Sequence, residues 1–409
     1  MKRIFSLLLV AVMLVATLGL LSGCSNEGSD FKVGFIFLHD ENSTYDMNFI
    51  EAARIAADDL LLATDQVIFK VNVPEDNSCY EAAADLVDQG CDIIFANSFG
   101  HEPYMIQAAK EFPDVQFCHA TGTNANIEKL PNFHNAFANI YEGRYLAGVA
   151  AGIKLNEKIA NGEITAEEAK IGYVGAFEYA EVISGYTSFY LGVKSKCPTV
   201  TMEVEFTGSW YDETKEQEAA KKLIANGCVL ISQHADSMGA PRACEEAGIP
   251  NVSYNGSTID ACPNTFITAS RIDWTPYFVY MVNCVKNGEE IAVDWSKGMY
   301  DGSVKMEDLN EAIFTSYNDA RREFNTAKVA LNDTASNSLV EGEEPLYVFD
   351  TDNFTVNGEK VESYLVDLDG DGTAETEAII DGYFHESEFR SAPYFDLKID
   401  GITLLNSAF

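Results

Sequence analysis

Aromatic and polar side chains occur together in several short segments of this chain, each directly after an apolar run. The segments span residues 39–46, 97–101, 176–179, 207–212 and 233–237. Flat apolar rings beside carboxylates and amides suit a small planar ligand with polar edges, such as a nucleobase on a sugar. A single ring could merely fill the core of its own half, but the matching positions of the segments favour a shared site.

Familiar catalytic patterns are missing from the sequence. It contains no GxSxG, HExxH or P-loop motif and no GxGxxG after a strand. The six histidines are scattered without metal-ligand spacing, and among 64 Asp and Glu residues a pair of carboxylates carries almost no information. We therefore expect a binding protein with no cofactor and no metal, not an enzyme. A surface hydrolase acting on nucleosides is the alternative from a different class.

One acidic segment near the C-terminus resembles a calcium-binding loop. Asp367, Asp369, Asp371 and Glu375 are spaced so that the backbone could wrap a hard cation. However, Ala378 stands where such a loop needs its bidentate Glu, and both flanks look like strands. A hairpin turn is the predicted structure, and calcium binding is the alternative.

Alternating strands and helices must position the aromatic and polar segments. Apolar runs that predict strands lie at residues 32–37, 67–73, 91–96 and 115–120, with helical patterns at 48–62, 79–89 and 102–112 between them. The second half repeats this order from residue 170 onward, and Gly227-Cys228 echoes Gly90-Cys91. Near-continuous apolar strands are typical of parallel sheets covered on both faces. The predicted fold class is α/β, with two doubly wound parallel-sheet lobes.

The two repeats also predict how the chain is divided. Ligands of doubly wound sheets bind beyond the carboxyl ends of the strands, so two facing lobes joined by a hinge would form a closing cleft. We assign residues 31–145 and 266–300 to the first lobe and residues 146–265 and 301–347 to the second. Residues 348–409 alternate Val, Tyr, Phe and Ile with Asp and Gly, which predicts a small β-rich C-terminal extension.

The N-terminus predicts export. Lys2 and Arg3 precede an apolar stretch over residues 4–21, and small residues lead up to Cys24. A membrane-spanning helix is the alternative, since such a stretch can just cross a bilayer. The run Leu-Ser-Gly-Cys resembles the lipobox of bacterial lipoproteins, in which the cysteine is acylated. This resemblance implies a signal peptide at 1–23, lipidation at Cys24 and a linker at 24–30.

Composition excludes several partners. The 409 residues include 64 Asp plus Glu and 27 Lys plus Arg, a formal net charge of −37. So acidic a surface repels nucleic acid and anionic lipid headgroups. The hydrophobic share of 47% argues against disorder. The eight cysteines beyond Cys24 are widely spaced without a CxxC, so we expect mostly unpaired, buried thiols.

Several motifs together resemble one family. They are Gly208-Ser209-Trp210-Tyr211-Asp212 with Lys215-Glu216 behind it, matches within 173–192, Gln233-His234-Ala235-Asp236-Ser237, Gly143 to Gly148, and Trp274-Thr275-Pro276-Tyr277. They resemble the basic membrane protein family of lipoprotein substrate-binding components of ABC importers. Several members bind purine nucleosides. The resemblance spans roughly residues 32–302 and implies the periplasmic-binding-protein type 1 fold.

The family resemblance also implies roles for individual residues. Trp210 and Tyr45 would stack on opposite faces of a base, Asp40 would accept hydrogen bonds at the cleft, and Glu142 could meet a sugar. The full set of candidate ligand-binding residues is Asp40, Tyr45, Phe99, Glu142, Phe177, Trp210, Asp236, Asn255 and Arg271. Ser43 stands where one branch of the family has Trp, and Arg271 lies near a sugar-contacting lysine position. Nucleoside, free base and other flat ligands therefore stay open.

These inferences predict an extracytoplasmic receptor, anchored to the cell membrane by lipid and monomeric. It would capture a purine nucleoside or related small molecule by lobe closure and deliver it to an ABC permease. No covalent chemistry is expected. A sugar or autoinducer receptor is the alternative among binding proteins.

Overall fold

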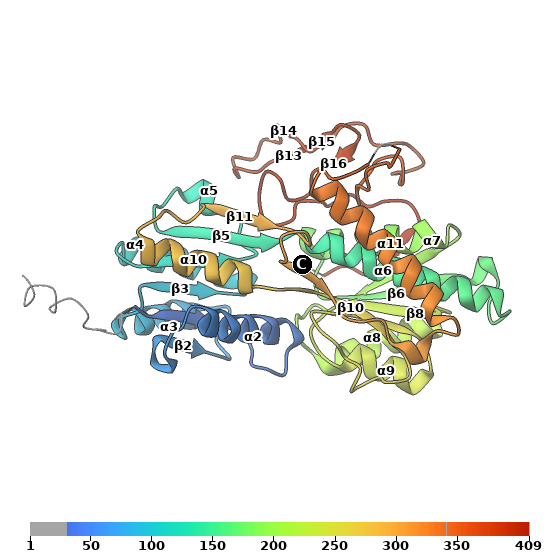
Figure 1. Ribbon diagram of the computed structural model, residues 1–409, viewed down its shortest axis with the longest axis horizontal. Helices are drawn as coiled ribbons and strands as arrows, with labels where there is room; N and C mark the ends of the chain where they lie inside the picture. The colour runs from blue at the N-terminus through green and yellow to red at the C-terminus, as the bar shows by residue number, and fades with distance from the viewer. Residues whose placement is uncertain (1–30, 341, 409) are drawn as a thin grey trace, which may run out of the picture.

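The computed structural model describes residues 31–340 and 342–408 and consists of two sheet-centred lobes with a C-terminal extension (Figure 1). The predicted signal peptide, Cys24 and the linker lie outside the described residues. Within the described part, no helix combines the length and the apolar character needed to cross a membrane.

The first lobe contains a six-stranded parallel sheet. Its order is β11-β5-β4-β3-β1-β2, with β1 Val33–Ile36, β2 Val67–Lys70, β3 Ile93–Ala96, β4 Gln116–Ala120, β5 Phe133–Ala138 and β11 Asp294–Lys297. Helices α2 (Thr44–Asp59) and α10 (Thr275–Asn287) pack together on one face, and α3 (Asn77–Asp88) and α4 (Glu102–Glu111) pack together on the other. The short helix α5 (Ala125–Glu128) precedes β5.

The second lobe contains a seven-stranded sheet, parallel except at one edge. Its order is β12-β10-β9-β8-β6-β7-β17, with β6 Lys170–Gly175, β7 Thr201–Phe206, β8 Leu230–His234, β9 Asn251–Tyr254, β10 Phe266–Ile272, β12 Val304–Met306 and β17 Ile402–Leu404. Only β12 is antiparallel to its neighbour among these strands. The helices are α6 (Ile140–Ala160), α7 (Ala180–Lys196), α8 (Glu213–Ala225), α9 (Gly239–Ala247) and α11 (Tyr317–Ala335).

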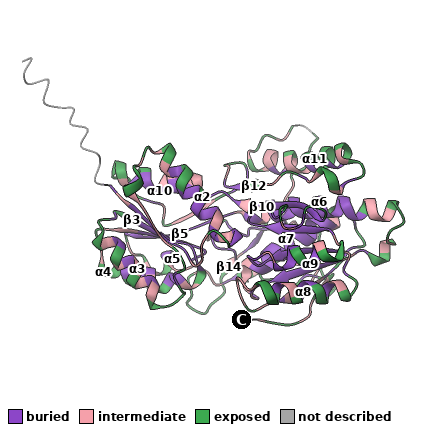
Figure 2. Cartoon of the chain, turned by 90° about the horizontal axis from the view of Figure 1, so that it is seen from below, coloured by how far each residue is buried: buried purple, intermediate pink, exposed green. Residues whose placement is uncertain are grey.

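Apolar periodicity explains these elements. Strands β1 and β3 are buried at every position because helices cover both faces of the sheet, as Figure 2 shows. Two equivalent helices, α3 and α8, are followed by Gly90 (φ 82°) and Gly227 (φ 91°), and the chain then enters the next strand at Cys91 and Cys228. Glycine adopts this left-handed conformation without a steric penalty, which explains the repeated Gly-Cys pair.

Backbone contact between α6 and α7 organises the second lobe. A Cβ atom added to Gly192 would lie 2.0 Å from the carbonyl oxygen of Tyr145, and one added to Gly148 would lie 2.0 Å from the carbonyl oxygen of Phe189. The two glycines therefore let the helices approach more closely than larger residues would allow. Cation–π contacts place the guanidinium of the buried Arg144 on α6 over rings from neighbouring elements of the same lobe.

The chain crosses between the described sheets after β5, after β10 and after β11. One boundary therefore differs from the predicted division, which placed residues 266–300 in the first lobe. Strand β10 (Phe266–Ile272) pairs with β9 in the second sheet, and only α10 and β11 return to the first lobe. The apolar pattern of residues 266–272 contains no information about which sheet this strand joins.

The C-terminal extension is mostly irregular. Its short strands β13 (Leu365–Val366) and β14 (Thr376–Glu377) form one antiparallel pair, and β15 (Ile379–Ile380) and β16 (Tyr383–Phe384) form another. Its last strand, β17, extends the second sheet in parallel with β7. The extension is thus attached to the second lobe. The expectation of unpaired thiols is confirmed, because the cysteines from Cys79 to Cys284 are all free and buried.

Replacing Gly192 with alanine is expected to lower the free energy of unfolding by about 1–3 kcal/mol, because the new methyl group would collide with the α6 backbone. Gly256→Ala is the matched control, since nothing lies within 4 Å of its added Cβ atom. Thermal or urea unfolding of both variants measures the effect. Equal stability of the two variants would contradict the close helix contact.

Candidate functional site

A small cavity of about 20 Å³ lies between the carboxyl ends of the two sheets. The first lobe contributes side chains after β1, β3 and β4: Leu38, His39, Tyr45, Asp46, Ser98, Phe99 and Thr121. The second lobe contributes Glu181, Trp210, His234, Asp236 and Tyr254. The cavity therefore occupies the position at which doubly wound sheets bind ligands.

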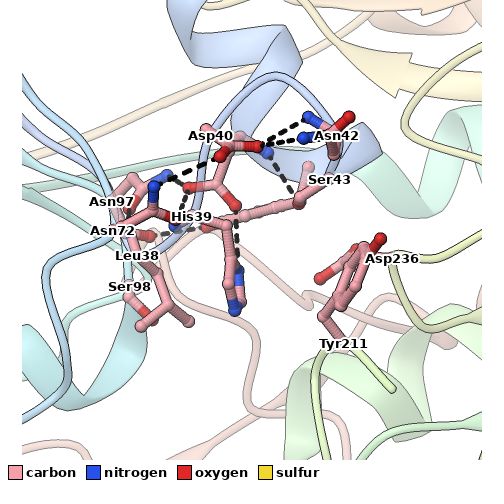
Figure 3. A network of polar contacts seen from close by, with 12 residues as sticks. Leu38, His39, Asp40, Asn42, Ser43, Asn72, Asn97, Ser98, Tyr211 and Asp236 are labelled. Atoms are coloured by element: carbon pink, nitrogen blue, oxygen red, sulfur yellow. Dashed lines mark hydrogen bonds and ion pairs between the residues drawn. The ribbon is translucent and has the colours of Figure 1, made fainter. Parts of the chain in front are cut away.

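Hydrogen bonds fix the first-lobe side of the cavity (Figure 3). The Asp46 carboxylate accepts from Asn97 Nδ2 at 2.7 Å and from the His39 backbone N–H at 3.2 Å. Tyr45 donates its hydroxyl to the Asn97 carbonyl at 2.7 Å. Ser43 caps the start of α2 by accepting from the Asp46 N–H. The cap and the Asp46–Asn97 bond together hold Tyr45 and Asp46 toward the cleft.

Aromatic rings from both lobes gather at the cavity. Phe177 stacks on Tyr179 with centroids 5.2 Å apart and meets Trp210 edge-on at 5.1 Å. Phe99 of the first lobe lies 5.2 Å from Tyr179 of the second. Trp210 is thus supported from behind by Phe177 while it lines the cavity itself.

One buried carboxyl group links the two second-lobe loops that line the cavity. Glu216 on α8 accepts from the Ser237 N–H at 3.2 Å and from the Asp212 N–H at 3.1 Å. Trp210 lies two positions before Asp212, and Asp236 directly precedes Ser237. Burial raises the pKa of Glu216 to about 7 despite these hydrogen bonds.

Asp236 has the most perturbed carboxyl group of the cavity. Burial raises its pKa well above the usual range, and the negative charges of Asp46, Glu216 and Glu181 add to the shift. The protonated form is therefore favoured, and a protonated carboxyl can donate as well as accept a hydrogen bond. His234 beside it contacts Glu181 through Nε2 at 3.3 Å, while burial lowers the histidine's pKa.

Direct contacts hold the lobes together over the cavity. The Thr44 N–H of the first lobe donates to the Asp236 carbonyl at 3.2 Å, and Asn48 Nδ2 donates to Asn255 Oδ1 at 3.3 Å. The rings of His39 and Tyr211 also meet across the cleft, 5.4 Å apart. A volume of about 20 Å³ holds roughly one water molecule. A larger ligand therefore needs the lobes to separate.

The structure brings four of the candidate ligand-binding residues together. Tyr45, Phe99, Trp210 and Asp236 all line the cavity. Phe177 packs behind Trp210 and does not line it. Asn255, with φ 63°, holds the lobe contact to Asn48 instead.

Three candidate residues lie away from the cavity, so their predicted positions are corrected. The exposed carboxylate of Asp40 is occupied by Asn42 at 2.7 Å and Asn72 at 3.2 Å. Glu142 accepts from the Met299 N–H at 2.6 Å, on the hinge side of the molecule. Arg271 on β10 pairs with Glu307 at 2.9 Å.

Eight other cavity residues were not among the candidates: Leu38, His39, Asp46, Ser98, Thr121, Glu181, His234 and Tyr254. Asp46 belongs to the same predicted loop as Asp40, but only the helix cap turns it inward. Tyr254 is the last residue of β9. The sequence could have indicated it, because ligands of parallel sheets bind at the carboxyl ends of the strands. Glu181 lies at the start of α7. The sequence does not distinguish it from other acidic residues nearby, such as Glu178.

The acidic segment of the extension forms the predicted hairpin turn between β13 and β14. Asp367 accepts from the N–H groups of Gly370 at 2.8 Å and Gly372 at 2.9 Å. Carboxylate oxygens of Asp367, Asp369 and Asp371 lie within 4.8 Å of one another, and Glu375 is not part of this group. The Asp367 carboxylate, which would be the first ligand of a calcium-binding loop, thus accepts hydrogen bonds from backbone N–H groups.

Sequence comparison identifies the family. Residues 62–331 match the family described as "ABC transporter substrate-binding protein PnrA-like". The chain belongs to this family. It is therefore a substrate-binding protein of the ABC-transporter type, a class of non-enzymatic proteins that work outside the cytoplasm with a membrane permease.

Individual relatives differ in their ligands. A purine-binding protein of Brucella abortus is 32% identical over 299 residues, covering 72% of this chain and 80% of that protein. A putative ABC transporter glucose-binding protein of Haloferax volcanii is 30% identical, covering 65% of each chain. A solute-binding protein structure from Aeropyrum pernix matches with a TM-score of 0.61 at 18% identity, covering 75% of this chain and 92% of that chain. The structural match supports the periplasmic-binding fold.

The Glu216→Gln variant is expected to gain stability relative to wild type as pH rises. The raised pKa of about 7 means that wild type loses stability as pH rises from about 4.5 through 7, because the unfolded chain releases the Glu216 proton in this range while the folded protein keeps it. Glutamine does not titrate. The difference in melting temperature, variant minus wild type, should become more positive between pH 5 and pH 8. A constant difference would show that Glu216 is charged at both pH values.

Proposed function

We propose that the cleft captures a purine nucleoside or a related nucleobase ligand by closure of the two lobes. The observation that carries this proposal is that Trp210 of the second lobe and Tyr45 and Phe99 of the first line one cavity. Rings contributed by opposing lobes can enclose a flat heterocycle as the lobes close, and every base has two faces suited to stacking.

The polar side chains of the cavity support the same ligand class. Asp46 offers carboxylate oxygens that accept hydrogen bonds from ring or amino N–H groups. Asp236, held toward its protonated form, can donate to a ring nitrogen or a carbonyl oxygen. A purine presents both kinds of group along its edges. The 32% identical relative named as purine-binding adds independent support.

A sugar is the second candidate, because the 30% identical relative is named as a glucose-binding protein. Sugars also stack on aromatic rings, but they need hydrogen-bonding groups around their whole rim. In this cavity, His39, Tyr45, Phe99, Trp210, His234 and Tyr254 supply six rings among twelve lining residues. That composition favours a flat ligand.

In the full proposal, the receptor is monomeric, anchored by a lipid on Cys24, and delivers its ligand to an ABC permease. The lipobox-like segment supports the anchor. Binding proceeds by hinge closure without covalent chemistry. A nucleoside hydrolase would instead lose turnover when one carboxylate is replaced, whereas a receptor only changes affinity.

Native mass spectrometry of protein purified without ligand exchange tests the ligand class. The expected result is an added mass equal to a purine nucleoside or nucleobase, released as free ligand on activation. Brief denaturation and refolding provide the ligand-free control. A bound hexose in place of a purine would refute the proposal.

Trp210→Ala is expected to weaken guanosine binding by about 1–3 kcal/mol, the range for loss of one base-stacking contact. Tyr300→Ala serves as the matched control, because its ring is 60% exposed and does not line the cavity. Isothermal titration calorimetry of both variants gives the affinities. Unchanged affinity in Trp210→Ala would remove Trp210 from the binding site.

A further inference from the structure

A second and much larger cavity lies on the hinge side of the molecule. Its volume is about 840 Å³, and it shares no lining residue with the cleft cavity. The first-lobe strand β11, the start of α6, the end of α11 and the C-terminal extension form its walls. Figure 1 shows the extension and α11 lying over this side. The family match ends at residue 331, so the extension that completes the cavity lies beyond it.

Acidic groups on three separate segments line this cavity. They are Glu142 on α6, Asp294 on β11, and Glu386 and Glu388 on the extension. Arg390 is the one permanently charged cation among the described lining residues. Its guanidinium donates to the backbone carbonyls of Ala392 and Pro393 and forms no ion pair with these carboxylates.

One of the carboxylates has a buried oxygen atom without a hydrogen-bond partner. Asp294 Oδ1 is buried without a hydrogen-bond partner, while Oδ2 accepts from the Ser391 N–H at 3.0 Å. Glu142 is 9% exposed and accepts from the Met299 N–H through Oε2. Buried polar atoms in proteins are normally hydrogen-bonded, so Asp294 Oδ1 indicates a missing donor.

Aromatic rings form another part of the wall. Tyr347, Tyr383 and His385 stack in sequence, with centroids 3.9 Å apart in each pair. Ring faces attract organic cations, most strongly where water is excluded. Burial raises the pKa of Glu142 and of Glu386, each to about 7, so a neighbouring positive charge would favour their charged forms.

The arrangement does not suit a single metal ion. Within the described part of the chain, the only group of three candidate ligand atoms within 4.8 Å is Asp367, Asp369 and Asp371, outside this cavity. No three of the described carboxylates of the cavity meet that distance, so they are spread over its walls. A ligand that carries several positive charges along a chain could reach them together.

We propose that the hinge-side cavity is a binding site for a linear organic polyamine. Its ammonium groups would donate hydrogen bonds to Glu142, Asp294 and Glu386, and its methylene segments would lie along the tyrosine rings. This inference is independent of the cleft ligand, because the two cavities have different walls.

Calorimetric titration with spermidine, at an ionic strength of about 0.15 M, tests the proposal. Wild type is expected to bind one spermidine saturably. The double variant Glu142→Gln/Glu386→Gln should bind about tenfold more weakly or worse, since charged hydrogen bonds are lost. Asp369→Asn/Asp371→Asn is the matched control, because it replaces the same number of carboxyl groups with amides on the exposed turn outside the cavity. This control variant should bind spermidine with the same affinity as wild type.

Two results would overturn the proposal. One is the absence of saturable binding to wild type. The other is an equal loss of spermidine affinity in both double variants, which would mean that spermidine binds non-specifically to the acidic surface. Melting temperatures verify that the variants are folded. If Glu142→Gln/Glu386→Gln does not fold, Asp294→Asn is measured in its place and is expected to weaken binding in the same direction.

Discussion

The carboxyl ends of two parallel sheets face each other across one cleft, and the rest of the molecule depends on this arrangement. The chain crosses between the lobes after β5, β10 and β11. We expect the lobes to open and close around these crossings. Each strand end then delivers a loop to the same cleft, so residues far apart in sequence, such as Tyr45 and Trp210, line one cavity.

The sequence predicts the fold because apolar periodicity and the repeated Gly-Cys turn are local signals. The sheet that β10 joins is not local, since it depends on where the chain crosses the hinge. The site shows the same limit. Asp40 and Asp46 are both acidic and only six positions apart, but the Ser43 cap and the Asn97 amide turn only Asp46 into the cavity. Glu142 comes directly after the first crossing between the lobes and lies in the hinge-side cavity, not in the cleft.

Electrostatics distinguishes the two cavities. In the cleft, burial and neighbouring negative charges favour a neutral Asp236, which suits a ligand with both donors and acceptors. On the hinge side, dispersed carboxylates, one of them with an unsatisfied buried oxygen, favour a ligand with several positive charges. The acidic surplus of the chain disfavours polyanionic partners at the surface, but it does not distinguish between these two ligands. The buried surroundings of the carboxyl groups in each cavity determine which ligand that cavity favours.

The most direct test of the account is a crystal structure of the protein with guanosine. The account predicts the base in the cleft, with one face on Trp210, the other on Tyr45 or Phe99, and its polar edge at Asp46 or Asp236. The cleft cavity of that complex would be larger than the present one of about 20 Å³. Guanosine bound elsewhere, or a cleft that takes up glucose and excludes guanosine under the same conditions, would contradict it.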